Sequence, residues 1–459
     1  MMLSTALPPR TSHYRRDIKV MVHNSKKQWM EWISVKKLWL MSFGYTTVQS
    51  RLPVIITQIV DYLSRNKDEI VKEVGEVARD DVKMVTGLLS KLKHDLQTNK
   101  SLELLSSDGP DVAIWNDYFN HTAEVEGADP RWYYSPWLYV ECYMYRRIRE
   151  MFELSTSLQS MDPFRKQKED ALYNSMTTIS FLSSYIMKLF QRPNELRNEE
   201  VRRELIKLIH VNLWGNRCDL SISSGADIVL TEDPLLKVNE LNDCLLVNDA
   251  EKVWDTLCDN VNGSDAIVDI VMDNAGYELF TDLCLADFLC TFGLAGKICF
   301  HAKVLPWYIS DTMVHDFHWT IERLAESKIS SLCSLAVRWH GYLRSGKWTL
   351  QADTFWTLPH DYSMMKKTDP DLYNSLGEAS LVIFKGDLNY RKLTGDINWD
   401  PTEPFSKALQ GFHPTKLITL RTLKADVICG LAPGQAELIS AKSEDWLISG
   451  QYAVIQFDG

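Results

Sequence analysis

Five short apolar segments in the second half of the chain constrain its fold most strongly. Near-continuous apolar runs of this length are typical of strands that are buried on both faces of a sheet. Helical segments such as Glu278–Phe292 lie between them, and strands that alternate with helices form βαβ units. The sequence therefore predicts a parallel sheet, with strands within Ala266–Met272, Ile298–Val304, Leu381–Phe384, Leu417–Leu420 and Tyr452–Phe457.

The first half of the chain has helical spacing instead. After Pro53, apolar residues recur three and four positions apart as far as Leu63, which predicts an amphipathic helix. Further helices are expected over Ile70–Leu92, from Ser135-Pro136 to about Met151, and near Glu199–Leu213. We therefore expect a basic, disordered extension at residues 1–40, an α-helical lobe at residues 41–215 and an α/β core at residues 216–459.

The first forty residues differ in charge from the rest. They hold eight basic and two acidic residues, so a net charge of −11 for the whole chain leaves −17 for the remainder. An organelle presequence is one explanation, but the segment lacks a clean amphipathic stripe. Met41 begins a stretch that resembles a natural start.

Composition excludes several function classes. A chain with 50 basic and 61 acidic residues lacks the basic footprint of a general nucleic-acid binder, and no apolar run reaches the ~18 residues of a membrane span. The nine cysteines include no CxxC pair, which argues against disulfides and a cysteine zinc site. We expect Cys218 and Cys299 to be small buried hydrophobic residues, and the protein to be cytoplasmic, with the nucleus as a second compartment.

Polar residues follow the predicted strands directly. Asp273 and Asn274 come after the first run, and Asp311 follows the second. Ligands of open parallel sheets bind beyond the carboxyl ends of the strands. Carboxylate and amide oxygens are ligands for hard divalent ions such as Mg²⁺ or Mn²⁺. The sequence thus predicts a metal site at this edge.

Cations follow the next two runs: Lys385, Arg391, Arg421 and Lys424. They could bind a phosphate, and Gly276 permits a tight turn into a helix whose N-terminus also attracts anions. Taken singly, the Asp-Asn pair before a glycine is an ordinary turn, and the segment after Lys385 an ordinary solvated loop. Taken together, they indicate metal-assisted phosphoryl chemistry.

Three other patterns are more simply structural. Gly341–Lys347 has the G-x₄-G-K spacing, but Trp348 stands where a phosphate-binding loop needs Ser or Thr, so a turn after a helix is expected. His315 and His318 lack the spacing of a zinc helix. His360 could lie near a pocket or cap a turn, and we favour the turn.

The chain resembles the metal-dependent damage-control phosphatases, in the subfamily with an RTxK motif, also called acidic residue or protein-glutamate O-methyltransferases. The resemblance covers about residues 44–459. It rests on matched blocks in the right order: SPWLYVECYMYRRI (135–148), LWGNRCDLS (213–221), DNAGYELFTDL (273–283), PWYISD (306–311), FWTLPHDY (355–362), FKGDLNYRKLTGD (384–396), GFHP (411–414) and RTLKADV (421–427).

The resemblance implies a Rossmann-like α/β/α core with an N-terminal helical lobe. It implies hydrolysis of sugar phosphates such as fructose 1-phosphate and fructose 6-phosphate with Mn²⁺, Co²⁺ or Ni²⁺, and Mg²⁺ is a further candidate. By motif, Asp273, Asn274 and Asp311 would bind the metal and Lys424 the phosphate. The substrate loop would be Asp387, Leu388, Asn389, Tyr390 and Arg391.

The expected catalytic residues are Asp273, Asp387 and Lys424. Asp387 would position a sugar hydroxyl or act as a base on the attacking water, and both roles stay open. Asp273 could instead form an aspartyl phosphate, which we rank lower because metal ligation already explains this residue. Lys424 and Arg391 would neutralise charge on the transferred group.

Two other functions compete with the phosphatase. In the first, an S-adenosylmethionine-dependent methyltransferase would modify glutamate side chains of proteins, with Glu278 and Asp311 as cofactor-binding candidates. The chain has no glycine-rich loop after a first strand to support it. In the second, an interaction protein would keep the fold without catalysis, and the intact metal-binding residues argue against this. The expected partners are small phosphate esters, without nucleic acid or membrane, and protein methyl acceptors only under the methyltransferase alternative.

Overall fold

The computed structural model describes residues 43–193, 195–216, 235, 240–258 and 266–459. Their strands form one seven-stranded sheet of order β1-β7-β6-β5-β2-β3-β4. β6, β5, β2, β3 and β4 are parallel to one another. The strand bounds are β1 Leu245–Asn248, β2 Ile267–Val271, β3 Lys297–His301, β4 Trp348–Gln351, β5 Leu381–Lys385, β6 Leu417–Thr422 and β7 Ala453–Asp458.

All five predicted strands are present, as β2, β3, β5, β6 and β7. The sheet is not entirely parallel as predicted, because β7 pairs antiparallel with β6. The ends of the connection between them bond to each other, Leu423 N to Tyr452 O and Gly450 N to Leu423 O, each at 2.8 Å. The chain therefore enters β7 at the same end of the sheet at which it leaves β6. The edge strands β1 and β4 were not predicted, because each is only four residues long and ends in a polar residue, as LLVN and WTLQ.

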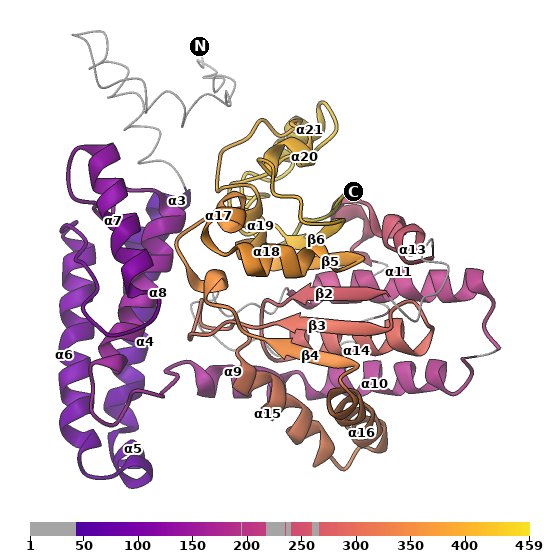
Figure 1. The fold of residues 1–459 in the computed structure, drawn as a ribbon, viewed down its shortest axis with the longest axis horizontal. Helices are drawn as coiled ribbons and strands as arrows, with labels where there is room; N and C mark the ends of the chain where they lie inside the picture. The colour runs from indigo at the N-terminus through magenta and orange to yellow at the C-terminus, as the bar shows by residue number, and fades with distance from the viewer. Residues whose placement is uncertain (1–42, 194, 217–234, 236–239, 259–265) are drawn as a thin grey trace.

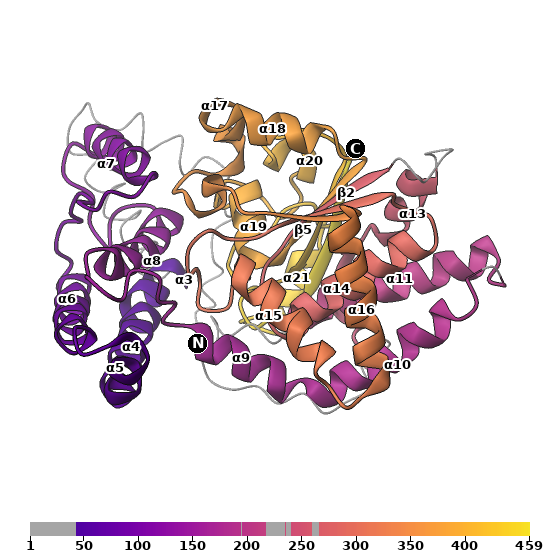
Figure 2. The same cartoon turned by 60° about the horizontal axis from the view of Figure 1, so that its bottom comes forward.

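Two layers of helices cover the sheet (Figure 2). Val268 and Ile270 of β2 face a core that is shared with α10 Met176–Phe190, α11 Asn198–Gly215, α13 Ala250–Cys258, α14 Tyr277–Thr291, α15 Val314–Ala325 and α16 Ser330–Ser345. Val382 and Phe384 of β5 face the second core. Its helices and helical turns include η4 Thr354–Thr357, η5 Tyr362–Met364, α17 Met365–Thr368, α18 Pro370–Gly377, α19 Gly386–Leu393 and α20 Phe405–Ala408. This arrangement confirms the predicted α/β fold class.

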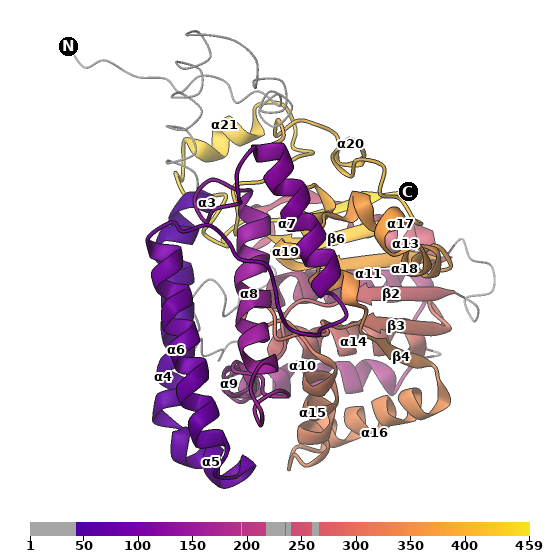
Figure 3. The same ribbon diagram turned by 60° about the vertical axis from the view of Figure 1, so that its left-hand side comes forward.

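The N-terminal helices lie beside the carboxyl edge of the sheet. The arrows of β2, β3 and β4 point towards them (Figures 1 and 3). They are α3 Phe43–Thr46, η1 Thr47–Arg51, α4 Leu52–Arg65, α5 Lys67–Val74, α6 Ala78–Gln97, α7 Val112–Glu126 and α8 Trp137–Glu153. The single helix expected over residues 70–92 is two helices, because Gly75 ends α5 at a φ of 113°. Pro136 is the N-cap of α8, so this helix begins one residue later than expected.

The helices α9 Arg165–Asn174, α10 and α11 connect this lobe to the sheet. Leu182 and Leu208, on α10 and α11, belong to the same core as Val268 of β2. We therefore describe these helices with the sheet, and the division at residues 215 and 216 stays a prediction. Among the described residues, no helix is long and apolar enough to cross a membrane.

Candidate active site

The loops after β2 and β3 are hydrogen-bonded to each other at the carboxyl edge. Thr312 N donates to Asp273 O and Ala275 N donates to Ser310 O, both at 2.7 Å. Asn274 and Asp311 form an isolated β-bridge between these bonds. The three predicted metal-binding residues, Asp273, Asn274 and Asp311, therefore come from two loops that hold each other in place.

The second loop has an unusual backbone. Tyr308 and Ile309 have φ values of 44° and 70°, a left-handed region that is costly for a β-branched residue such as isoleucine. Both side chains are buried, and the Tyr308 hydroxyl donates to Glu141 Oε2 at 3.1 Å. Such conformations persist where surrounding contacts enforce them, often at functional sites. Here they turn the chain towards Ser310 and Asp311.

Two amide side chains orient the Asp273 carboxylate. Its Oδ2 accepts hydrogen bonds from Asn216 Nδ2 at 2.5 Å and from Asn274 Nδ2 at 2.9 Å. Thr422, at the end of β6, donates to Asn216 Oδ1 at 2.6 Å and so fixes that amide. Asn216 was not among the predicted site residues, although it lies in the matched block 213–221.

A buried charged cluster lies beneath Asp273. Glu278 Oε2 accepts from Asn216 and Asn274, and its Oε1 accepts from Lys385 Nζ at 2.7 Å. Lys385 Nζ also lies 2.8 Å from Asp282 Oδ1. Burial raises the pKa of the Asp282 carboxyl, although the ammonium of Lys385 opposes this shift. Lys385 thus forms ion pairs with Glu278 and Asp282 behind the site and does not line its cavity.

A cavity opens at this edge, between the sheet and the helical lobe. The loops after β2 and β3 contribute Asp273, Tyr308 and Asp311 to its wall. The remaining wall residues come from the helical lobe, from α19 and from the end of β6: Arg51, Trp137, Glu141, Asp387, Leu388, Arg391 and Lys424. Carboxylates and cations thus face one small space.

Arg391 connects α19 to the helical lobe. Its guanidinium donates to Glu141 Oε2 at 2.7 Å and to Asp396 Oδ1 at 2.9 Å, and it stacks 3.6 Å from the ring centre of Trp137. Burial lowers the pKa of Arg391, but the two carboxylates outweigh this and raise it above its usual value. The residue is a fixed cation in the cavity wall.

Asp387 and Lys424 both line the cavity and lie next to each other. Asp387 Oδ1 accepts from Arg421 Nε at 2.7 Å and from Lys424 N at 3.2 Å. Lys424 Nζ donates to Asn216 O at 2.5 Å. Arg421 is buried, and its guanidinium also lies 4.0 Å from the ring centre of Tyr390. Its hydrogen bond therefore fixes the orientation of the Asp387 carboxylate.

The structure brings most, but not all, of the expected residues to the cavity. Asp273, Asp311, Asp387, Leu388, Arg391 and Lys424 line it, whereas Asn274, Glu278, Asn389 and Tyr390 are buried behind its wall. Asn389 Nδ2 donates to Lys385 O at 2.7 Å, and the Tyr390 hydroxyl contacts Cys429 Sγ at 3.2 Å.

The residues of the helical lobe that line the cavity were not predicted from the sequence. Trp137 and Glu141 belong to the matched block 135–148, which was the available sign of their importance. Cys218 lies outside the described residues. Cys299 is buried as predicted, and Gly346 forms the expected turn at the end of α16.

The donor set fits a divalent metal. The carboxylates of Asp273 and Asp311 are each less than 5% exposed and lie on one wall. The amide nitrogen of Asn274 donates to Asp273 Oδ2 at 2.9 Å, and its amide oxygen accepts from Ser310 Oγ at 2.5 Å. Oxygen donors of this kind suit a hard or borderline ion. Asp273, Asn274 and Asp311 are the residues that would hold it.

Comparisons with known proteins agree with this chemistry. A family profile described as "Damage-control phosphatase ARMT1-like domain" matches residues 47–439. The mouse protein named "Damage-control phosphatase ARMT1" is 43% identical over 424 residues, which are 91% of this chain and 96% of the mouse protein. The Xenopus tropicalis protein of the same name is 44% identical over 422 residues, 90% of this chain and 96% of that protein.

A solved structure of a DUF89 family protein from Pyrococcus horikoshii is 14% identical to this chain. It has a TM-score of 0.43, with 89% of this chain and 98% of that chain covered, a likeness that supports no conclusion about the site. The sequence relatives, in contrast, define the class: the protein is a phosphatase. More narrowly, the chain belongs to the damage-control phosphatase ARMT1-like family.

Proposed function

We propose that this protein is a metal-dependent phosphatase that hydrolyses small sugar phosphates, with fructose 1-phosphate and fructose 6-phosphate as substrates, in metabolite repair. The observation that carries the proposal is the cavity, because Asp273 and Asp311 share its wall with Arg391 and Lys424. A phosphate monoester needs cations for its charged oxygens and a polarised water for the attack.

The metal, Mn²⁺, Co²⁺ or Ni²⁺ with Mg²⁺ as a further candidate, would polarise a phosphate oxygen and lower the pKa of water in the site. Asn216 and Asn274 donate to Asp273 Oδ2 and so restrain the carboxylate that would bind the metal. Lys424 and Arg391 would bind the phosphate oxygens and neutralise the charge that develops on them. These cations are already fixed by protein contacts, so little reorganisation accompanies the reaction.

Asp387 is suited to the sugar. Its Oδ1 accepts the hydrogen bonds of Arg421 and Lys424 N, and its Oδ2 accepts none from the described residues. That second oxygen would bind a sugar hydroxyl or take a proton from the attacking water. A carboxylate that is held on one oxygen and open on the other can serve either role.

The experiment is phosphate release from fructose 1-phosphate by metal-stripped protein with each ion added back. Activity should return with a divalent ion and should be lost in Asp273→Ala. Asp400→Asn removes a charge from a loop residue that does not line the cavity, and it keeps the oxygen that accepts the hydrogen bonds of Thr402. It is the matched control and should behave like the wild type. No turnover with any ion, in protein whose circular dichroism shows it to be folded, would contradict the proposal for this substrate.

A further inference from the structure

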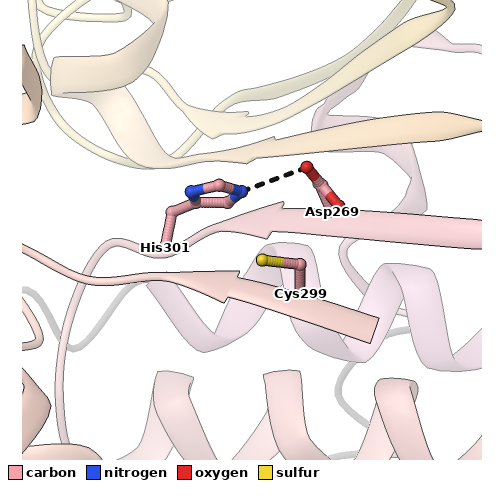
Figure 4. Close-up of side chains that lie close together, drawn as sticks. All are labelled: Asp269, Cys299 and His301. Atoms are coloured by element: carbon pink, nitrogen blue, oxygen red, sulfur yellow. Dashed lines mark hydrogen bonds and ion pairs between the residues drawn. The ribbon is translucent and has the colours of Figure 1, made fainter. Parts of the chain in front are cut away.

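A second group of potential metal ligands lies on one face of the sheet, and none of its residues lines the cavity. Asp269 of β2 and Cys299 of β3 are register partners, and His301 lies two residues further along β3. Alternate residues of a strand point to the same face, so all three side chains meet on one face of the sheet (Figure 4). Their ligand atoms lie within 4.8 Å of one another, and the residues are 3%, 8% and 1% exposed.

The spacing suits a single ion. His301 Nε2 lies 3.1 Å from Asp269 Oδ2. Two ligand atoms bound tetrahedrally to zinc at about 2.0–2.1 Å lie roughly 3.3 Å apart. The two atoms therefore already have nearly the separation that a shared ion requires, and the Cys299 sulfur is the third donor.

A further carboxylate stands behind the imidazole. Asp353 Oδ2 lies 3.7 Å from His301 Nδ1, and neither buried atom has a hydrogen-bond partner among the described residues. Metal-bound histidines characteristically donate their other ring N–H to a carboxylate, which fixes the tautomer. Asp353 is placed to be this acceptor for a His301 that binds a metal through Nε2.

Charge balance favours a dication. A carboxylate, a thiolate and a neutral imidazole together carry two negative charges, which one divalent ion cancels. Buried sites are stable when their charges are compensated in this way. The mixed sulfur, nitrogen and oxygen set selects zinc or a similar borderline ion over magnesium or calcium, in contrast to the oxygen ligands of the candidate active site.

Without a metal, the same residues would form a buried ion pair. Burial lowers the pKa of His301, but Asp269, Asp353 and Cys299 outweigh it and raise the pKa well above its usual value. In that state the Cys299 sulfur faces a charged imidazole instead of an ion. The two states differ in whether the sulfur binds a metal, which is directly measurable.

We propose that Asp269, Cys299 and His301 form a structural site for zinc or a closely similar transition-metal ion, with Asp353 as the hydrogen-bond acceptor of His301. The ion cross-links β2 to β3 and, through Asp353, to the N-cap of η4. The loops that carry Asp273 and Asp311 follow the same two strands. The site therefore anchors the base of the candidate active site without taking part in it.

The test is metal analysis of the full chain purified without chelator, followed by replacement of the ion with Co²⁺. The wild type should retain one zinc per chain, and the cobalt form should show the near-ultraviolet charge-transfer absorption of a cobalt–thiolate bond. Cys299→Ser should lose that band and one equivalent of ion, and Asp269→Asn should lose the ion. Asp273→Ala should keep the band, which separates this site from the candidate active site.

Cys284→Ser is the matched control, because Cys284 is also a buried cysteine but lies on α14 outside the cluster. It should keep both the ion and the band. A folded wild type that gives no thiolate band with Co²⁺ would overturn the proposal even if Cys299→Ser does not fold. Retention of the band in Cys299→Ser would overturn it equally.

Discussion

The backbone of Gly386 lies directly against the carboxylate of Asp273. A β-carbon on residue 386 would stand 1.8 Å from Asp273 Oδ2, and the φ of 84° at this residue is itself unfavourable for other amino acids. The first residue of α19 thus forms one side of the space in which the Asp273 carboxylate sits. Position 386 accepts only glycine if Asp273 is to keep its orientation.

We predict that Gly386→Ala displaces the Asp273 carboxylate and lowers kcat by about 100-fold, the usual cost of a misplacement of ~1 Å. Gly411→Ala is the matched control, because Gly411 has a φ of 86° but a β-carbon there would meet no atom within 4 Å beyond its chain neighbours. The control should lose about 1 kcal/mol of stability and keep its activity. Equal loss of activity in both variants would show that backbone strain, and not contact with Asp273, is responsible.

Lys385 is predicted to contribute to stability more than to substrate binding. In Lys385→Met, the buried carboxylates of Glu278 and Asp282 lose their shared cation, which should cost about 3–5 kcal/mol in urea unfolding at neutral pH. The loss should shrink as the pH falls towards ~4, because a protonated carboxyl no longer needs the cation. Lys407→Met, which removes an exposed ion pair with Glu403, should cost less than about 1 kcal/mol.

The strand-end residues were predictable because the rule behind them is general. Parallel strands place their carboxyl ends at one edge, so Asp273, Asp311 and Lys424 could be grouped from the sequence alone. The direction of each side chain could not be predicted in this way. Lys385 is the last residue of β5 and Lys424 follows β6, yet the first faces Glu278 within the core and the second lines the cavity.

The residues that the helical lobe contributes to the cavity could not be predicted from a sequence pattern, for a different reason. Glu141 binds Arg391 across 250 residues of chain, and no local periodicity links two such positions. Nor does the sequence around Trp137 indicate that its ring supports Arg391 at the cavity. Contacts of this kind depend on how two folded units meet, which the spacing of apolar residues within either unit does not define.

Arg391 is predicted to set affinity for the phosphate ester. Arg391→Lys keeps the charge but loses the two-sided hydrogen bonding to Glu141 and Asp396 and the stacking on Trp137. A hydrogen bond to a charged group contributes about 1.5–3 kcal/mol. Its loss from the substrate complex predicts a roughly 10- to 100-fold rise in KM. Steady-state kinetics with fructose 1-phosphate would measure it.

Arg338→Lys is the control for this prediction. Arg338 also combines an ion pair, with Asp287, and a stacking contact, 4.7 Å from the ring centre of Phe190, but it lies on α16 away from the cavity. Its KM should equal that of the wild type. An unchanged KM in Arg391→Lys would remove this residue from the substrate site and leave it a link between α19 and α8.

Lys392 is predicted to make stability rise with pH in the alkaline range. Burial, aided by the nearby charge of Lys303, lowers the pKa of the Lys392 amine to about 8, whereas an unfolded lysine titrates near ~10.4. Between these values the unfolded chain holds the proton and the folded chain has released it, so the free energy of unfolding increases with pH. The increase from this group should be about 3 kcal/mol between roughly pH 8 and pH 10.4.

Other groups titrate in the same range, so the effect is read as a difference between two proteins. Urea unfolding of the wild type and of Lys392→Met at a series of pH values should give curves that diverge as the pH rises, with the wild type gaining stability relative to the variant. Lys366→Met removes an exposed lysine of α17 and should run parallel to the wild type. Parallel curves for Lys392→Met as well would mean that the amine keeps its proton in the folded state, stabilised by the carbonyl of Leu358 that accepts its hydrogen bond at 2.6 Å.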